Sequence, residues 1–302
     1  MAFFEKGRLW QNIVWTTERA LENGALVPVP TDVAFIEDNG IQFFVRVLAT
    51  LARKDEALKI QAASVKSGAN HNPFLPPEKD LSVTDISDTH IAILNKYNVV
   101  EHHLLIVTRH YEDQDILLTL NDFEALWLCL AEYRSIGFYN GGKDAGASQR
   151  HKHLQLVPLP LSPRGPAIPI EPIIANERQT DGPLLTIPGF PFLHSFTRLR
   201  KELIHAPFAA ARETFHIYAS MLRRLSMSVP SDHGLVRQSM PYCLLVTREW
   251  MLLIPRSQEC FGDISLNSLA FAGSLFVRNE QQLEQIRSYR PMNILRSVTI
   301  PP

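Results

Sequence analysis

Residues 140–155, NGGKDAGASQRHKHLQ, join a loop of small residues to the start of a short apolar run. We expect this run to be a β-strand, in which successive side chains point to opposite faces. His151, His153 and Gln155 then share one face, while the leucines between and after them pack inward. Three polar groups on an otherwise apolar strand are costly to bury without partners, so this face is better explained as the wall of a site.

The loop before this strand carries Gly146, Ala147, Ser148 and Gln149. Small side chains let the main-chain N–H groups of such a loop approach a ligand closely, which is the local geometry that holds phosphate oxygens. The loop and the polar strand face together predict a phosphate-binding site.

Two plainer explanations of the histidine pair remain open at this point. A His-x-His pair on a strand occurs often by chance, and many such pairs are only buried polar residues with hydrogen-bond partners. The pair could also supply two zinc ligands, with His102 or His103 as a third, but no cysteine or carboxylate is evidently placed to complete that site. We therefore expect no metal ion held by the protein itself.

The composition is that of a folded protein without a strong charge bias. The chain has 302 residues, of which 45% are hydrophobic and 20% charged, so it can bury a sizeable core. Lys and Arg number 30 against 31 Asp and Glu, a formal net charge of −1, which argues against binding to nucleic acid through bulk charge.

The cysteines and the apolar runs bear on the compartment. Cys129, Cys243 and Cys260 form no Cys-x-x-Cys pair, which fits a reducing compartment better than a disulfide scaffold or a zinc ribbon. No signal peptide is evident, and no stretch approaches the roughly 18 apolar residues of a membrane span. We expect a soluble cytoplasmic protein that binds neither membranes nor nucleic acid.

Hydrophobic periodicity and turn residues predict both helices and strands. Helices are expected at 8–24, 119–138, 207–227 and 279–286, and strands at 33–48 (a hairpin), 91–98, 102–109, 150–157, 194–198, 240–249 and 250–257. The hairpin turns at Asp38-Asn39-Gly40, and the second helix begins at a capping box of Thr119 and Asp122. Residues 53–82 are polar and rich in turn formers, and we expect them to form a mobile surface loop.

The chain divides into two similar halves. Prolines recur every few residues after the polar strand, which excludes a helix or a central strand there and predicts an extended connector. Residues 242–257 are similar to residues 91–109, because each segment contains two apolar strands with a short connection. We predict an N-terminal half at 1–157, a connector at 158–192 and a C-terminal half at 193–302 that completes the site.

Five stretches in both halves carry a resemblance to a known family: NPFLP (72–76), ILNKYNVVEHHLLIVTR (93–109), LTLNDFEALW (118–127), NGGKDAGASQRHKHLQ (140–155) and NSLAFAGSLFVR (267–278). They resemble the histidine-triad superfamily, and most closely its branch of ATP adenylyltransferases, also called diadenosine tetraphosphate (Ap4A) phosphorylases. Gln155 is the residue that distinguishes the hydrolase branches of this superfamily from the transferase branches. Hydrolases of the superfamily usually carry a third histidine there, whereas His-x-His-x-Gln is typical of the transferases.

This resemblance implies an α+β fold in which two histidine-triad-like halves build a mainly antiparallel sheet with packed helices. It also implies reversible phosphorolysis of Ap4A to ATP and ADP through an adenylyl-His153 intermediate, with His151 in a supporting position. The nucleophile is a neutral imidazole whose other ring nitrogen donates to a main-chain carbonyl. Gln155 can donate hydrogen bonds to phosphate oxygens but cannot act as an acid or a base, which favours phosphate over water as the acceptor. Ser148 and the main chain of residues 146–149 would hold phosphate oxygens in the transition state.

By the same resemblance, further residues contact the nucleotide or its phosphates: Asn95 (ribose), Lys96, Asn140, Asn267, Ser268 and Arg278, with Lys66 of the mobile loop as a phosphate-binding cation. The plain alternative for Lys66 and Arg278 is a solvated surface charge, and for Asn95 it is a turn between strands. The sequence departs from the family at Arg278, where relatives often have Lys, and at Cys243, where they often have Asn.

The ligands implied are small-molecule nucleotides (Ap4A, ATP and ADP) and phosphate, with sulfate as a substitute acceptor. A divalent cation, Mg²⁺, is expected to arrive bound to the polyphosphate instead of in a protein cage. Three other functions stay open: nucleotidyl transfer from a nucleotide sugar, hydrolysis of a dinucleoside polyphosphate, and nucleotide binding without turnover. The presence of His153 and Gln155 counts against a pure binding protein. The sequence leaves the oligomeric state open.

Overall fold

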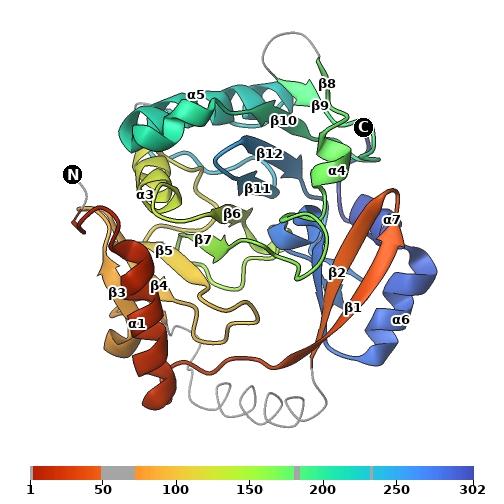
Figure 1. Ribbon diagram of the computed structural model, residues 1–302. Helices are drawn as coiled ribbons and strands as arrows, with labels where there is room; N and C mark the ends of the chain where they lie inside the picture. Colours follow the sequence, from red (N-terminus) through yellow and green to blue (C-terminus); the bar gives the residue numbers. More distant parts are fainter. Residues whose placement is uncertain (1–2, 49–71, 180–183, 232–233) are drawn as a thin grey trace.

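A ten-stranded antiparallel sheet forms the centre of the computed structural model, which describes residues 3–48, 72–179, 184–231 and 234–302 (Figure 1). Across the sheet the strands follow in the order β3 (Ser82–Asp85), β4 (His90–Leu94), β5 (Leu104–Thr108), β7 (His153–Pro158), β6 (Ser135–Gly141), β11 (Tyr242–Val246), β12 (Trp250–Pro255), β10 (Ser195–Arg198), β9 (Leu185–Thr186) and β8 (Arg178–Gln179). Every neighbouring pair is antiparallel.

The predicted α+β fold of two similar halves is confirmed. Read from the edge to the centre, the N-terminal half has the order β3-β4-β5-β7-β6, and the other side of the sheet has the order β8-β9-β10-β12-β11. On that side β8 and β9 come from the predicted connector and β10, β12 and β11 from the C-terminal half. In each half a long helix precedes the central strand: α3 (Leu120–Leu130) comes before β6, and α5 (Pro207–Arg224) comes before β11. The two central strands pair with each other, so the halves share one continuous sheet.

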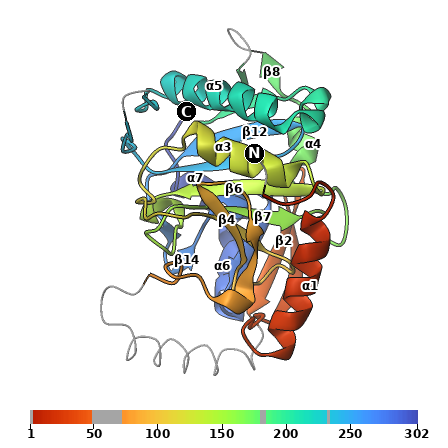
Figure 2. The same ribbon diagram turned by 90° about the vertical axis from the view of Figure 1, so that its left-hand side faces the viewer.

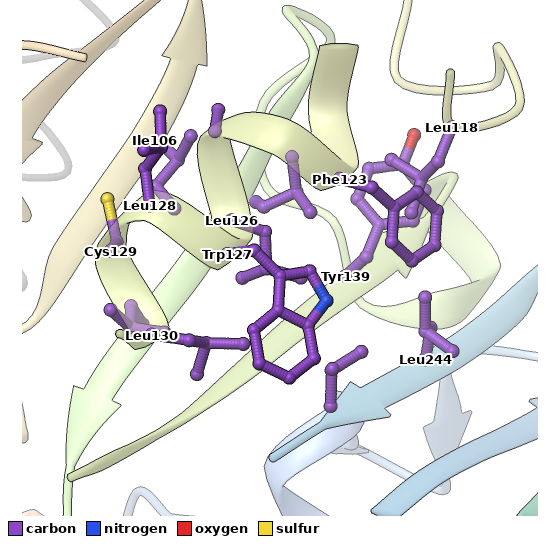
Figure 3. Packing of buried hydrophobic residues seen from close by; sticks show 14 of the residues in the cluster. Ile106, Leu118, Phe123, Leu126, Trp127, Leu128, Cys129, Leu130, Tyr139 and Leu244 are labelled. Carbon is purple, nitrogen blue, oxygen red and sulfur yellow. The ribbon is translucent and has the colours of Figure 1, made fainter. Parts of the chain in front are cut away.

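Helices α1 (Leu9–Glu22), α3 and α5 cover one face of this sheet (Figure 2). Trp127 of α3 is fully buried and donates from its indole Nε1 to Thr214 Oγ1 of α5 at 2.8 Å, which satisfies its one polar atom. Figure 3 shows Trp127 and Phe123 packed among apolar side chains that include Tyr139 and Leu244 of the central strands. This core joins the two halves on the helical side of the sheet.

Helix α3 ends earlier than the sequence predicts. Its capping box is formed as expected, with Thr119 N–H donating to Asp122 Oδ2 at 2.6 Å. The helix stops at Leu130, however, and residues 135–138, predicted as its last turn, belong to strand β6. All residues of β6 are buried, so no exposed polar face distinguishes this strand from a buried helix in the sequence pattern.

A smaller sheet lies on the side of the ten-stranded sheet that is opposite to helices α3 and α5 (Figure 1). The predicted hairpin is present as β1 (Thr31–Asp38) and β2 (Ile41–Leu48), and β2 pairs in parallel with β15 (Ser274–Val277). Helix α6 (Glu280–Tyr289) and the unpredicted helix α7 (Pro291–Ser297) lie beside these strands, and η4 (Ser268–Ala272) contacts β15. The short strands β13 (Cys260–Phe261) and β14 (Ile264–Ser265) pair with each other. This sheet therefore takes strands from both predicted halves.

The segment predicted at 158–192 as an extended connector is not extended throughout. It contains the short helix α4 (Glu171–Ile174) and the edge strands β9 and β8. Pro172 lies in the first turn of α4, where its missing N–H leaves no hydrogen bond unmade. Further short helices in the described ranges are η1 (Lys79–Leu81), η2 (Lys143–Ala145) and η3 (Lys201–His205).

Part of the predicted mobile loop, residues 53–71 with Lys66, lies outside the described residues. Its end is described and leads through η1 into β3. Among the helices of the described ranges, none has the length and apolar character needed to cross a membrane.

Candidate active site

His153 and Gln155 line a pocket of about 440 Å³ on the sheet face opposite α3 and α5. The alternation predicted from the sequence is present, because the leucines at 154 and 156 belong to the core beneath the helices. The pocket also takes in Phe74, the end of β4 with Asn95 and Lys96, and the loop before β7 with Ser148 and Gln149. Six predicted site residues are therefore brought together around one cavity.

His153 has the geometry of a neutral nitrogen nucleophile. Its Nδ1 lies 2.8 Å from the main-chain carbonyl of His151. Because a carbonyl only accepts, Nδ1 carries the proton and Nε2 carries the lone pair, as the sequence predicts. The side chain is 3% exposed, and burial lowers its pKa from 6.5 to about 4, so the ring is uncharged at neutral pH. No described residue hydrogen-bonds to Nε2, which is left available to a ligand in the pocket.

His151 supports His153 and does not line the pocket. Its Nε2–H donates to the carbonyl of Thr108 at 2.8 Å, and its Nδ1 accepts from Asn72 Nδ2 at 3.0 Å. Strand β7 begins only at His153, so His151 lies just outside it, but both rings contact Phe74. With both ring nitrogens occupied, His151 contributes chiefly through the carbonyl that orients His153.

The side chain of Gln114 fills the gap between β6 and β7 beside the nucleophile. Its Oε1 accepts from His153 N–H at 2.9 Å, and its Nε2 donates to the carbonyls of Asn140 at 2.9 Å and His153 at 3.2 Å. The direct pairing of the two strands ends at Phe138 and Gln155. Beyond this pair, the buried side-chain amide of Gln114 forms the hydrogen bonds that the strands would otherwise form with each other. The strands can separate here without leaving main-chain groups unpaired.

A second buried histidine lies behind Gln155. Asn95 Nδ2 donates to His103 Nδ1 at 3.2 Å, so the ring carries its proton on Nε2, which is buried and has no partner at hydrogen-bond distance. Burial lowers the pKa of His103 to about 4, and the neighbouring amide of Gln155 opposes this only in part. One neutral ring thus lies between Asn95 and Gln155.

The loop before β7 uses two of its N–H groups internally. Those of Gly146 and Ala147 donate to carbonyls of the preceding turn at 2.8 and 3.2 Å. Of the four main-chain N–H groups expected to hold phosphate, only those of Ser148 and Gln149 are therefore left for a ligand. The N–H groups of these two bond to no described residue, and both residues line the pocket.

Gly146 also marks the contact with the C-terminal half. Its φ is +93°, and a Cβ there would lie 2.9 Å from Asn267 Cα, so a side chain would collide with main chain. Next to Asn267, the fully buried Ser268 donates from its N–H to Asn140 Oδ1 at 2.9 Å. Asn140 and Ser268, both expected to contact the ligand, do not line the pocket with His153, and their hydrogen bond ties β6 to η4.

The three predicted cations are placed differently. Lys96 lines the pocket and forms an ion pair with Glu78 at 2.7 Å. Arg278 is exposed and lines a neighbouring cavity together with Asn267. Lys66 lies outside the described residues.

The C-terminal half carries apolar residues at the positions that match the reacting ones. The pairing of β6 with β11 relates the halves by an approximate two-fold axis between these strands. By its place in the strand order, β12 corresponds to β7, and its residues on the face of Gln155 are Trp250, Leu252 and Ile254. All three are buried in an apolar core, so His153 has no histidine counterpart on that face of β12.

A zinc site finds no support in the described part of the chain. No group of three or more His, Cys, Asp or Glu side chains lies close enough there to hold a metal ion. His102, considered as a third ligand, contacts Thr17 Oγ1 at 3.1 Å through its Nδ1.

Sequence reasoning missed several residues that build this site. Gln114 and Thr108 give no signal, because each acts through contacts with residues far away in the sequence. Asn72 begins the NPFLP stretch, which carries part of the resemblance and could have drawn attention to it. The sequence indicates His103 only as a candidate zinc ligand.

The sequence and the fold are both similar to those of known yeast proteins. Diadenosine 5',5'''-P1,P4-tetraphosphate phosphorylase 2 of Saccharomyces cerevisiae is 26% identical over 267 residues, which is 81% of this chain and 79% of the relative. Protein APA1 of the same yeast is 24% identical over 295 residues, 88% of this chain and 86% of the relative. The crystal structure of yeast Ap4A phosphorylase Apa2 has a TM-score of 0.78 with 23% identity and covers 100% of this chain and 96% of that chain.

Two family descriptions together span most of the sequence. Residues 1–176 match the Ap4A phosphorylase N-terminal domain, and residues 188–301 match the ATP adenylyltransferase C-terminal domain. The first match alone extends over more than half of the chain and contains the pocket residues from Phe74 to Gln155. The protein therefore belongs to the Ap4A phosphorylase (ATP adenylyltransferase) family.

Proposed function

We propose that this protein catalyses the phosphorolysis of Ap4A to ATP and ADP through an adenylyl-His153 intermediate. The observation that carries the proposal is the state of His153, whose ring is buried and uncharged, with its Nδ1–H held at 2.8 Å by a carbonyl and its Nε2 available in the pocket. The names of the yeast relatives support it, since one is an Ap4A phosphorylase and Apa2 has been crystallised with Ap4A and with AMP.

The reaction proceeds in two displacements at one phosphorus. The lone pair of His153 Nε2 attacks the α-phosphorus of Ap4A, the P–O bond to the neighbouring phosphate breaks, and ATP leaves with that electron pair. An oxygen of inorganic phosphate then attacks the same phosphorus, the P–N bond breaks, and its electron pair returns to Nε2. ADP forms, and the proton of the hydrogen phosphate ion goes to solvent. Nδ1 keeps its proton throughout, and the carbonyl of His151 stabilises the charge that the ring gains.

The groups around the reacting position donate hydrogen bonds but do not take up protons. The N–H groups of Ser148 and Gln149 and the amide of Gln155 can donate to non-bridging phosphate oxygens as charge shifts in the transition state. His103 is a poor base, because its Nδ1 already accepts from Asn95 and its pKa is about 4. A water molecule therefore has no evident base among these groups, whereas phosphate is already anionic. This favours a phosphorylase over a hydrolase.

The polyphosphate and its counterion complete the set of ligands. Mg²⁺ would arrive bound to the phosphate oxygens, which are the ligands it prefers, as part of the substrate. In the pocket lining, the carboxylate of Glu78 is already paired with Lys96. We place the protein in the cytoplasm, because its three cysteines are unpaired, as expected in a reducing compartment.

Trapping of the intermediate tests the proposal. Incubation with Ap4A and Mg²⁺ but without phosphate should release one equivalent of ATP per chain and add one adenylyl group to the protein mass. His153→Ala should do neither, whereas the control His216→Ala, on the exposed side of α5, should do both. Phosphate added afterwards should remove the adenylyl group as ADP.

Two results would redirect the assignment. Steady formation of AMP without phosphate would make the protein a hydrolase. A protein that is adenylylated or uridylylated by a nucleotide sugar, and not by Ap4A, would belong to the nucleotide-sugar branch.

A further inference from the structure

A second cavity, of about 250 Å³, lies between the small sheet and the loop before β7. Its lining comes from distant parts of the sequence and includes Arg46 on β2, Gly146 in the loop, Asn267 before η4, and Ser274 and Arg278 at the two ends of β15. Asp263, Ser265 and Gln282 are its other polar side chains. The sequence pattern gives no signal for Arg46.

Arg46 is a partly buried cation without a carboxylate partner in the described residues. Its Nη1 donates to Ser274 Oγ at 2.7 Å and its Nη2 to the carbonyl of Leu161 at 3.2 Å, and both acceptors are neutral. The guanidinium also lies over the ring of Phe44, 4.3 Å from its centroid. Burial lowers the pKa of Arg46 to about 10, so the group is still charged at neutral pH.

The remaining donors of Arg46 have no acceptor in the described structure. A guanidinium has five N–H groups, of which the contacts with Ser274 and Leu161 use two. A partly desolvated charge without a counter-charge is costly, and an anion in the cavity would offset that cost. Arg278 adds a second cation at the same cavity and forms no ion pair with the described residues. Asp263, a carboxylate in the lining, already accepts from Gln282 Nε2 at 3.0 Å.

The cavity adjoins the loop that borders the pocket of His153. Gly146 contributes to its lining, and Ser148, two residues further on, lines the pocket of His153. Arg46 and His153 are both close enough to His103 to act on it electrostatically. The loop from 146 to 148 therefore borders both the pocket of His153 and the cavity that contains Arg46.

We propose that Arg46 binds the phosphate group that lies on the far side of the α-phosphorus from His153, beside Arg278, which the family resemblance already implies as a phosphate contact. This group is first the phosphate through which ATP leaves, and then the inorganic phosphate that replaces it. Both occupy one position, because each bond to the α-phosphorus breaks or forms opposite Nε2. The inference rests on the proposed function, since it specifies where the leaving group and the acceptor of that reaction bind.

Binding of ATP and AMP tests the inference without turnover. In a His153→Asn background, which cannot form the covalent intermediate, Arg46→Gln should weaken ATP binding roughly 10- to 100-fold, the usual effect of losing hydrogen bonds from a charged group. AMP binding should not change, because AMP lacks the phosphate concerned. Arg164→Gln is the matched control, since Arg164 lies over Phe35 on the small sheet and outside the cavity, and it should change neither affinity.

Steady-state kinetics provide a second readout in the presence of His153. Arg46→Gln should raise the KM for inorganic phosphate by a similar factor, and Arg46→Lys should fall between it and the wild type, because lysine keeps the charge but not the planar donor geometry. Should Arg46→Gln fail to fold, Arg46→Lys tests the same prediction.

Two outcomes separate this inference from the proposed function. If Arg46→Gln weakens the binding of ATP and AMP equally, or changes neither affinity, the role of Arg46 is overturned. The proposed function still stands in that case, provided that the wild type phosphorolyses Ap4A. A wild type that binds ATP but does not phosphorolyse Ap4A overturns the proposed function, and the ATP-to-AMP comparison then decides the phosphate site alone.

Discussion

The low pKa of His153 predicts that adenylylation continues at pH values where an exposed histidine would be protonated. Burial lowers this pKa from 6.5 to about 4. At about pH 5.5, a group with a pKa near 4 is roughly 97% neutral, whereas a group with a pKa near 6.5 is about 9% neutral. Lowering the pH from about 8 to about 5.5 should therefore leave the rate of adenylylation almost unchanged, where an exposed histidine would lose about tenfold.

Rapid-quench measurement of ATP release in the first turnover is the assay. Phosphate is omitted, so its own ionisation near neutral pH does not enter the profile. A return to about pH 8 should restore the full rate, which separates titration of His153 from unfolding. An acid limb centred near pH 6.5 would refute the reasoning, because it would show that the nucleophile is hydrated and not buried.

Three further predictions concern stability in urea. The folded pKa values of His153 and His103 lie below the ordinary 6.5, so their contribution is fully present above pH 6.5 and declines as the pH falls towards about 4. The free energy of unfolding should fall by about 2 kcal/mol per histidine between about pH 7.5 and 5. Over the same pH range, the free energy of unfolding of His153→Asn should fall by about 2 kcal/mol less than that of the wild type. Lys152→Met should cost about 3–5 kcal/mol, because it removes the 2.9 Å ion pair of the buried Asp122, and a cost below about 1 kcal/mol would contradict this. Gly146→Ala should cost more than Gly40→Ala, since both glycines have positive φ but only Gly146 meets main chain at 2.9 Å; equal losses would show that this contact relaxes freely.

The strand with the reacting residues could be predicted from the sequence because its pattern is local. A period of two places His153 and Gln155 on one face whatever the rest of the chain does, and the structure confirms this. The hairpin at residues 38–40 and the capping box at Thr119 were predicted for the same reason, since turn and cap chemistry act over a few residues.

What the sequence could not show depends on burial and on distant contacts. Strand β6 is buried on both faces and therefore lacks the alternation that would distinguish it from the end of a helix. Asn140 and Ser268 belong to the predicted site, but they bind each other at the junction of the halves, a contact between residues 128 positions apart. Arg46 reaches its cavity only because β2 pairs with β15 near the other end of the chain.

The most direct test of the central claim is a product analysis with Ap4A and Mg²⁺, in the presence and absence of inorganic phosphate, for the wild type and His153→Ala. We predict ATP and ADP in equal amounts, in steady turnover only with phosphate, and no product from His153→Ala. Steady cleavage to ATP and AMP without phosphate, or undiminished turnover by His153→Ala, would contradict the assignment of His153 as the nucleophile of a phosphorylase.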